Sequence, residues 1–249
     1  MSGEDSEATE RGDIVASQWT RVGGELTGRR SLRPVMIEEL IADTARVARD
    51  EASLYWIAAS WLARHGSWVD LRRLRLALKA LDPVSRAVAG SLLSVAAKES
   101  PIAIRLVAAA GHARALSPAR PLFHIAESTP ALATLVRAES LPLFTRWGLW
   151  QDDITLRYDA IRPTAAILEN CPELRLRAAL GPGLEAEIVA HTLSQPVSAK
   201  ALREQLGATS LAIHAAAHAL VHRGVLQAET QGRAHMLSPT AFGRELAGI

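Results

Sequence analysis

The order of helix signals and turn residues over residues 184–246 constrains the fold of this chain more than any other feature. An amphipathic stretch over 184–195 predicts a helix, and the proline that follows it breaks the helical pattern. Ser198 then stands where its hydroxyl can cap a second short helix over 199–206. Gly207 suits the end of that helix, because glycine readily adopts a positive φ. Two helices joined by a tight turn are therefore predicted.

A third helix is predicted directly after this pair. Thr209 or Ser210 can serve as its N-cap, and Arg223-Gly224-Val225 closes it. The apolar residues between these limits repeat at helical spacing: Ile213, Ala216, Ala217, Leu220 and Val221. One side of the third helix is thus predicted to be buried, and the other side to face outward.

A β-hairpin is predicted after the third helix. Two runs with strand character, 225–230 and 233–237, flank the Gln231-Gly232 pair, which favours a tight turn. The residues 238–240, Ser-Pro-Thr, are typical of a helix start, so a last helix is expected beyond the hairpin.

Residues 184–249 resemble the winged helix-turn-helix superfamily of bacterial transcriptional regulators, of the arsenic-repressor and multiple-antibiotic-resistance-repressor kind. The resemblance covers about a quarter of the chain, and it rests on Ala201-Leu202, Leu206-Gly207, Thr209-Ser210, Ile213, Leu220, Arg223-Gly224-Val225 and Gly232-Arg233. It implies that the third helix enters the major groove of DNA and that the hairpin touches the neighbouring backbone. The candidate DNA contacts in this region are Lys200, Arg203, Thr209, Ser210, His214, His218 and Arg233.

The third helix departs from a typical DNA-reading helix in its chemistry. Its outward positions are Ser210, Leu211, His214, Ala215 and His218, and none carries the Arg, Lys, Asn or Gln side chains that match base edges in the major groove. Residues 184–249 contain five basic and five acidic residues, so their net charge is zero. Because phosphate attraction supplies much of DNA affinity, this region alone is expected to bind DNA weakly. A surface that contacts protein instead remains an alternative.

Composition predicts a mainly helical protein of the reducing cytoplasm. The hydrophobic content is 49% with only 4% aromatic residues, so alanine, leucine and valine dominate the apolar fraction. Cys171 is the single cysteine, which rules out a disulfide framework within one chain. The acidic start lacks the pattern of a signal peptide, and no apolar run reaches the ~18 residues typical of a membrane span. We therefore expect a cytoplasmic protein that does not enter a membrane.

The sequence predicts three parts. Residues 1–33 are acidic at their start and contain paired glycines, so a flexible N-terminal arm is expected. Residues 34–180 show successive short helical patterns and predict a helical domain, with a strand-like segment near 147–160. Gly181-Pro182-Gly183 separates this domain from the region 184–249. The predicted fold class is mainly α, with a helical N-terminal domain and a C-terminal winged helix that carries a small hairpin wing.

A basic segment lies inside the helical domain. Residues 64–120 hold ten basic and three acidic residues, a net charge of +7. In the helix expected over 68–81, Arg72, Arg75 and Lys79 recur at i, i+3 and i+7, which places them on one face. The stripe can be a solvated face, a phosphate-contacting surface that supplies the affinity missing from residues 184–249, or a surface for an acidic protein partner.

Metal and catalytic sites are weakly indicated. His214, His218 and His222 follow at i, i+4 and i+8, and two histidines at i, i+4 can share a metal ion, but solvated or DNA-facing histidines are the preferred interpretation. A phosphate-binding loop, a metalloprotease helix and a nucleophile elbow are all missing from the sequence. Asp152-Asp153 suits a turn for backbone reasons alone. We therefore expect neither a cofactor, nor a bound metal, nor enzymatic activity.

These observations favour a bacterial DNA-binding transcriptional regulator whose partner is double-stranded DNA. A homodimer is expected, because helix-turn-helix proteins gain affinity by pairing two half-sites about one helical turn apart. The alternative is a non-catalytic protein-interaction subunit, such as an antitoxin or a component of a defence complex.

Overall fold

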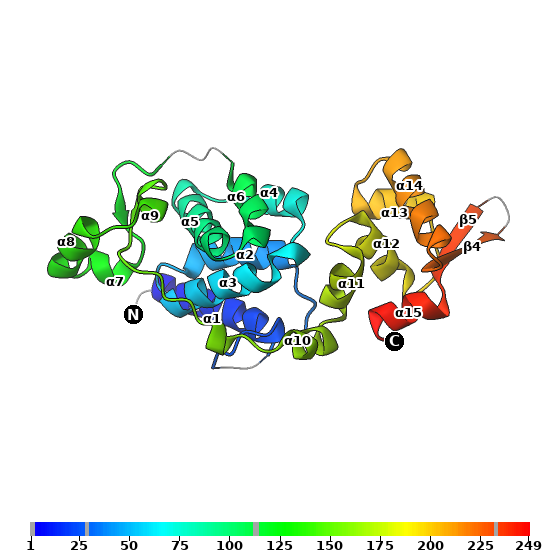
Figure 1. The fold of residues 1–249 in the computed structure, drawn as a ribbon, viewed down its shortest axis with the longest axis horizontal. Helices are drawn as coiled ribbons and strands as arrows, with labels where there is room; N and C mark the ends of the chain where they lie inside the picture. The colour runs from blue at the N-terminus through cyan, green and yellow to red at the C-terminus, as the bar shows by residue number, and fades with distance from the viewer. Residues whose placement is uncertain (1–2, 28–29, 112–114, 232–233) are drawn as a thin grey trace. The chain divides into compact units, whose positions relative to one another are not determined.

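The computed structural model describes residues 3–27, 30–111, 115–231 and 234–249. The chain forms two compact units, Met1–Ile167 and Leu168–Ile249. It is mainly helical, as predicted, with a small three-stranded antiparallel sheet near the C-terminus (Figure 1). Each unit is described in turn.

The first unit is mainly helical, and its two strands are short. Its α-helices are α1 (Gly3–Arg21), α2 (Ile37–Val47), α3 (Ala52–His65), α4 (Leu71–Lys79), α5 (Pro83–Glu99), α6 (Ile104–Ala110), α7 (His124–Glu127), α8 (Pro130–Ala138), α9 (Pro142–Thr145) and α10 (Thr164–Asn170), the last of which crosses into the second unit. Three 3₁₀ turns, Gly66–Trp68, Pro101–Ala103 and Tyr158–Ala160, and two strands, β1 (Arg120–Pro121) and β2 (Leu149–Trp150), complete it.

Helix α5 lies at the centre of the first unit and packs against α2, α3 and α6. Asp82 caps the start of this helix, because its carboxylate accepts hydrogen bonds from the amides of Val84 and Ser85. Gly90 leaves room for the Trp147 ring, because a Cβ at that position would lie 2.6 Å from its carbon atoms. The Trp147 indole donates to Ser94 Oγ at 3.0 Å. A small residue in α5 and a large aromatic on a distant loop thus fit together in the core.

The predicted flexible arm over 1–33 is wrong, because α1 is a long helix that packs into the core of the first unit. Val15, Trp19 and Val22 are buried, and Trp19 is 0% exposed. The Trp19 indole donates to Thr44 Oγ1 in α2 at 2.8 Å. The physical reason is that Val15 and Trp19 lie at i and i+4 on one face of α1, and Val22 follows directly after the helix.

The helix that bears the basic stripe is shorter than predicted. Instead of spanning 68–81 it covers Leu71–Lys79, because residues 66–68 form a 3₁₀ turn and Asp70 caps the helix through the amides of Arg72 and Arg73. Leu74 and Leu78 are buried, so they fix which face of the helix lies toward the core.

Only part of the strand-like segment near 147–160 is a strand. β2 covers Leu149–Trp150 and pairs in parallel with β1. Beyond it the backbone finds other partners: the amide of Arg157 donates to the Ser60 hydroxyl at 2.7 Å, and Tyr158–Ala160 is a 3₁₀ turn. The alternation of apolar residues in this segment therefore reflects an extended backbone that packs on a helix, and not a longer β-strand.

The second unit contains helices and the three-stranded sheet. After the end of α10 its elements are α11 (Pro172–Leu180), α12 (Leu184–Thr192), β3 (Val197–Ser198), α13 (Ala199–Leu206), α14 (Ser210–His222), β4 (Leu226–Gln231), β5 (Ala234–Pro239) and α15 (Ala241–Ala247). The strand order is β3-β5-β4, and all pairs are antiparallel. Val197 lies opposite Leu237, and Leu226 lies opposite Pro239.

The boundary between the units differs from the predicted one at residues 181–183. Helix α11 belongs to the second unit, because Leu176 is buried with Ile188 and Leu220 in a common apolar core. The Arg175 side chain donates to the carbonyl of Leu168 and lies against Gly248, where an added Cβ would overlap its guanidinium. The Gly181-Pro182-Gly183 segment is thus a turn inside the second unit.

The predicted helix caps of the second unit are confirmed. Ser198 accepts from the amide of Ala201 as predicted, and Thr209, one of the two predicted candidates, accepts from that of Ala212. Thr240, in the segment predicted to start the last helix, accepts from the amide of Gly243. Gly207 ends α13 with a φ of 59°, which is the left-handed conformation expected there. The first helix, predicted over 184–195, ends earlier, at Thr192.

A buried histidine couples the stability of the first unit to pH. His65 is 5% exposed and stacks on Trp68 with ring centres 4.4 Å apart. Its Nε2 has no hydrogen-bond partner among the described residues. Burial, with a smaller contribution from the neighbouring Arg64 charge, lowers the pKa of His65 to about 4.

We predict that the unfolding free energy falls by about 3 kcal/mol between pH 7 and pH 4 through His65 alone. In the unfolded chain the imidazole takes up a proton below its ordinary pKa of 6.5, whereas in the folded chain it stays neutral until the pH approaches 4. Stability is therefore lost as the pH falls through this window. Urea unfolding followed by tryptophan fluorescence reports this unit, because all six tryptophans precede residue 168.

The variant His65→Phe keeps an aromatic ring at the site but cannot take up a proton. Its loss of stability between pH 7 and pH 4 should be smaller than that of the wild type by the same amount. The exposed His191→Gln serves as the control and should lose as much as the wild type. Equal acid sensitivity in His65→Phe and the wild type would contradict the prediction.

Candidate nucleic-acid interface

Helix α14 presents the outward face that the sequence predicted. Ile213, Ala217 and Leu220 are buried against the rest of the second unit, which fixes the orientation of the helix, whereas Val221, predicted on the buried side, is exposed. The opposite side consists of exposed residues: Ser210, Leu211, His214, Ala215 and His218. Leu211 is 81% exposed. The face is therefore open to solvent, carries no lysine or arginine, and combines imidazoles with apolar surface.

Helix α13 precedes α14 and carries two of the predicted contacts. Leu202 points into the core and leaves Lys200 and Arg203 exposed. Arg203 lies 3.9 Å from the carboxylate of Glu204, which is a long and solvent-screened ion pair. Both cations are thus available to an anionic ligand.

The start of α14 uses one predicted contact for its own structure. The Thr209 hydroxyl accepts a hydrogen bond from the amide of Ala212, and its proton can still be donated to a ligand. Ser210 follows it and is exposed. The predicted hairpin contact, Arg233, lies outside the described residues, as does Gly232.

At the far end of α14, a cation that the sequence left unassigned is paired. Arg223 donates to Glu185 of α12, and its Nε also donates to the carbonyl of Ala219. This arginine therefore ties α14 to α12 and adds little net charge to the outward face.

The imidazoles of α14 differ in their arrangement. The rings of His218 and His222 are stacked, with centres 6.5 Å apart and planes 25° apart. No such ring contact joins His214 to His218 in the described structure. Within the described ranges, no group of three or more His, Cys, Asp or Glu side chains is arranged to hold a metal ion.

The basic stripe on α4 is exposed as predicted. The side chains of Arg72, Arg75 and Lys79 point to solvent and make no hydrogen bond or ion pair with any described residue. Their charges are therefore free to meet a ligand, and they share one face of one helix.

Other basic residues of the segment 64–120 make structural contacts, which a count of charges cannot show. Arg86 donates to the carbonyls of Leu78, Lys79 and Leu81 at the end of α4. Arg105 likewise donates to the carbonyls of Gly66 and Ser67. Arg64 lies over the Tyr158 ring at 4.8 Å. Among the described residues of this segment, Arg72, Arg75 and Lys79 are therefore exposed cations that share one helix face and have no internal partner.

The predicted contacts fall into two sets. Lys200, Arg203, Thr209, Ser210, His214 and His218 lie on adjacent helices of the second unit, whereas Arg72, Arg75 and Lys79 lie on α4 of the first unit. The structure brings the members of each set together and leaves the two sets in separate units.

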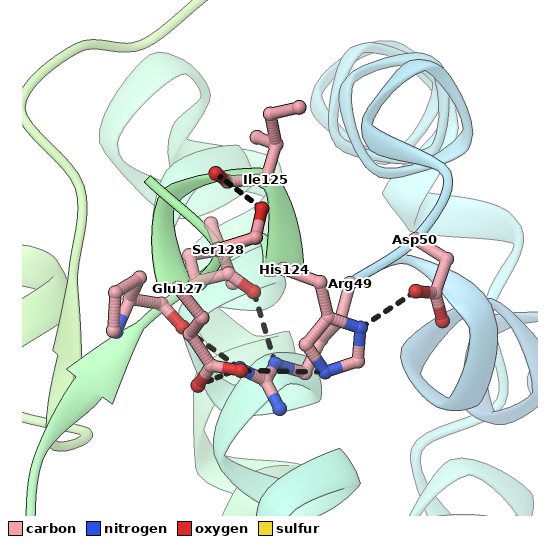
Figure 2. Close-up of polar contacts among 8 residues, drawn as sticks. Arg49, Asp50, His124, Ile125, Glu127 and Ser128 are labelled. Carbon is pink, nitrogen blue, oxygen red and sulfur yellow. Dashed lines mark hydrogen bonds and ion pairs between the residues drawn. The ribbon is translucent and has the colours of Figure 1, made fainter. Parts of the chain in front are cut away.

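Sequence reasoning missed one polar cluster, shown in Figure 2. Arg49 is 8% exposed and donates to the carbonyls of Pro121 and Leu122 and to Glu127, the last at 2.5 Å. His124 lies 2.6 Å from Asp50 and 3.7 Å from the second oxygen of Glu127.

This cluster joins the turn between α2 and α3 to the segment that contains β1 and α7. The Arg49 guanidinium donates to two backbone carbonyls and to one carboxylate. The cluster therefore holds the long segment between α6 and α7 against the turn that precedes α3. No local sequence pattern predicts this cluster, because its two halves lie more than 70 residues apart in the sequence.

Comparison with known proteins adds no relative: no family model, curated protein or solved structure matches the chain. Among the described residues, none of the helices combines the length and the apolar character needed to cross a bilayer.

Proposed function

We propose that the protein is a DNA-binding transcriptional regulator whose second unit is a winged helix-turn-helix domain. The observation that carries the proposal is the exposed face of α14, held at the end of a capped helix pair and followed by the β4-β5 hairpin. In a winged helix this element enters the major groove, and the strand order β3-β5-β4 is compatible with that fold.

In this proposal, cations outside α14 provide most of the affinity for DNA. The face of α14 brings hydroxyl and imidazole groups but no arginine or lysine, so it can follow the groove without the usual bidentate base contacts. Lys200 and Arg203 of α13 and the stripe on α4 carry the phosphate-binding charge in this proposal. A homodimer that pairs two half-sites is part of the proposal.

A second candidate function is a non-catalytic subunit that binds protein, such as an antitoxin or a defence-complex component. The specific observation in its favour is the exposed Leu211 beside Ala215 on a neutral helix face, since interface cores are depleted in charge. On this alternative the α4 stripe meets an acidic partner protein.

A salt titration of the full-length protein separates the two functions. Fluorescence anisotropy with random duplex DNA, and with duplex from upstream of its own gene, should show an affinity that falls steeply with salt. The upstream duplex should bind more tightly than the random one if bases or DNA shape are read. Sedimentation at the same protein concentrations gives the oligomeric state. Absence of DNA binding even at low salt would favour the protein-binding subunit.

A further inference from the structure

The two stacked imidazoles near the end of α14, His218 and His222, form a pair that the proposed function does not explain, because only His218 is among the proposed DNA contacts. His218 and His222 are one turn apart, both are exposed, and their rings already lie nearly parallel. Neither imidazole makes a hydrogen bond or an ion pair with another described residue, so the ring nitrogens face solvent.

We propose that His218 and His222 bind one divalent transition-metal ion, such as Zn²⁺, Ni²⁺ or Cu²⁺. Neutral imidazole is a preferred ligand of these ions, whereas Mg²⁺ and Ca²⁺ require oxygen ligands. Histidines at i and i+4 project from adjacent helical turns and can reach a single ion. Water completes the coordination, because the site has two protein ligands and is open to solvent.

The geometry requires only a small adjustment. With ring centres 6.5 Å apart, the two rings must turn toward each other to bring one nitrogen of each to the ~2.1 Å distance of a metal–imidazole bond. Both side chains are exposed, so they can make this change by rotation about their χ angles. The backbone of α14 already sets the spacing.

Nearby charge does not oppose the ion. Arg223 is the closest cation in sequence, but its guanidinium is paired with Glu185 of α12. His214 lies one turn before His218 and has no ring contact with it in the described structure. The structure thus selects the later pair from a row of three histidines that the sequence alone cannot rank.

The test is a metal titration of the full-length, untagged protein by isothermal calorimetry, with Zn²⁺, Ni²⁺, Cu²⁺ and Mg²⁺ as separate probes. We expect one ion per chain and affinities in the order Cu²⁺ above Ni²⁺ and Zn²⁺, with no Mg²⁺ binding. The spectrum of bound Cu²⁺ in electron paramagnetic resonance should show coupling to two imidazole nitrogens.

Three matched variants assign the ligands. His218→Gln and His222→Gln should each weaken Zn²⁺ binding by about a hundredfold, because losing one ligand removes the chelate. His214→Gln, on the same helix and equally exposed, should bind as the wild type does. All three variants should keep the helical circular-dichroism signal of the wild type, since the substituted side chains are exposed.

The outcomes that overturn the proposal are distinct. Unchanged binding in His222→Gln with loss in His214→Gln would assign the ion to the earlier pair, and unchanged binding in all three variants would place it elsewhere. One ion per two chains would replace the single-chain site by a shared one. The site does not depend on the proposed function, because metal binding and DNA binding are measured separately.

Discussion

Replacing Arg72 and Arg75 together by glutamate is expected to abolish the binding of duplex DNA while leaving the fold intact. Both side chains are exposed and have no partner among the described residues, so their removal breaks no internal contact. Two phosphate contacts are lost and two negative charges are placed against the DNA backbone. Any residual binding should show a salt slope shallower by about two units.

The matched control for this variant is Lys98→Glu together with Arg33→Glu, which changes the net charge by the same amount at two exposed positions outside α4. Affinity in the control should fall only slightly, because the lost attraction is long-range and screened by salt. If both double variants weaken binding equally, overall charge rather than the stripe carries the affinity. Retained tight binding in Arg72→Glu/Arg75→Glu would contradict the role of α4 outright.

The second unit was the part most predictable from sequence, because local signals decide it. Ser198 and Thr209 cap their helices as expected, residues 238–240 lead into the last helix, and Gly207 takes the left-handed conformation. Caps and positive φ values depend on residues only a few positions apart, so a single sequence contains them. The end of α12 was predicted at residue 195, but the helix ends at Thr192, and the next segment leads into strand β3.

The first unit shows where such reasoning fails. The acidic start of the chain suggested a flexible arm, yet the burial of Trp19 against α2 and α3 depends on contacts with residues far along the chain. The boundary error has the same cause, since Leu176 joins a core whose other members begin after residue 184. The Arg49 cluster also joins residues more than 70 positions apart. Tertiary partners decide these features, and local patterns do not contain them.

Helical periodicity predicted which of the candidate contact residues are exposed, but it could not rank them. The outward face of α14 and the stripe on α4 were both identified from helical periodicity. The count of +7 over residues 64–120 could not show that Arg86 and Arg105 donate to backbone carbonyls, which holds their side chains against the protein. Likewise, periodicity gave three equivalent histidines, and only the structure distinguishes His218 and His222 as the stacked pair.

Replacing Trp19 by alanine is expected to lower the unfolding free energy of the first unit by about 3–5 kcal/mol. The side chain is 0% exposed, lies edge-on to Trp61 with ring centres 5.8 Å apart, and donates to Thr44 Oγ1. The truncation leaves a cavity among α1, α2 and α3 that these rigid helices can fill only in part. Trp19→Phe should cost less, because it keeps most of the apolar volume and Thr44 retains its bond to the carbonyl of Leu40.

The control for this prediction is Ile14→Ala, on the same helix but 53% exposed, which should change stability by no more than about 0.5 kcal/mol. Urea unfolding of the full chain, followed by the fluorescence of the remaining tryptophans, reports the first unit in every variant. If Trp19→Ala lowers the unfolding free energy strongly and Ile14→Ala hardly changes it, α1 is an integral helix of the core. Equal and small costs would instead mean that the N-terminal segment is the detached acidic arm that its composition alone suggests.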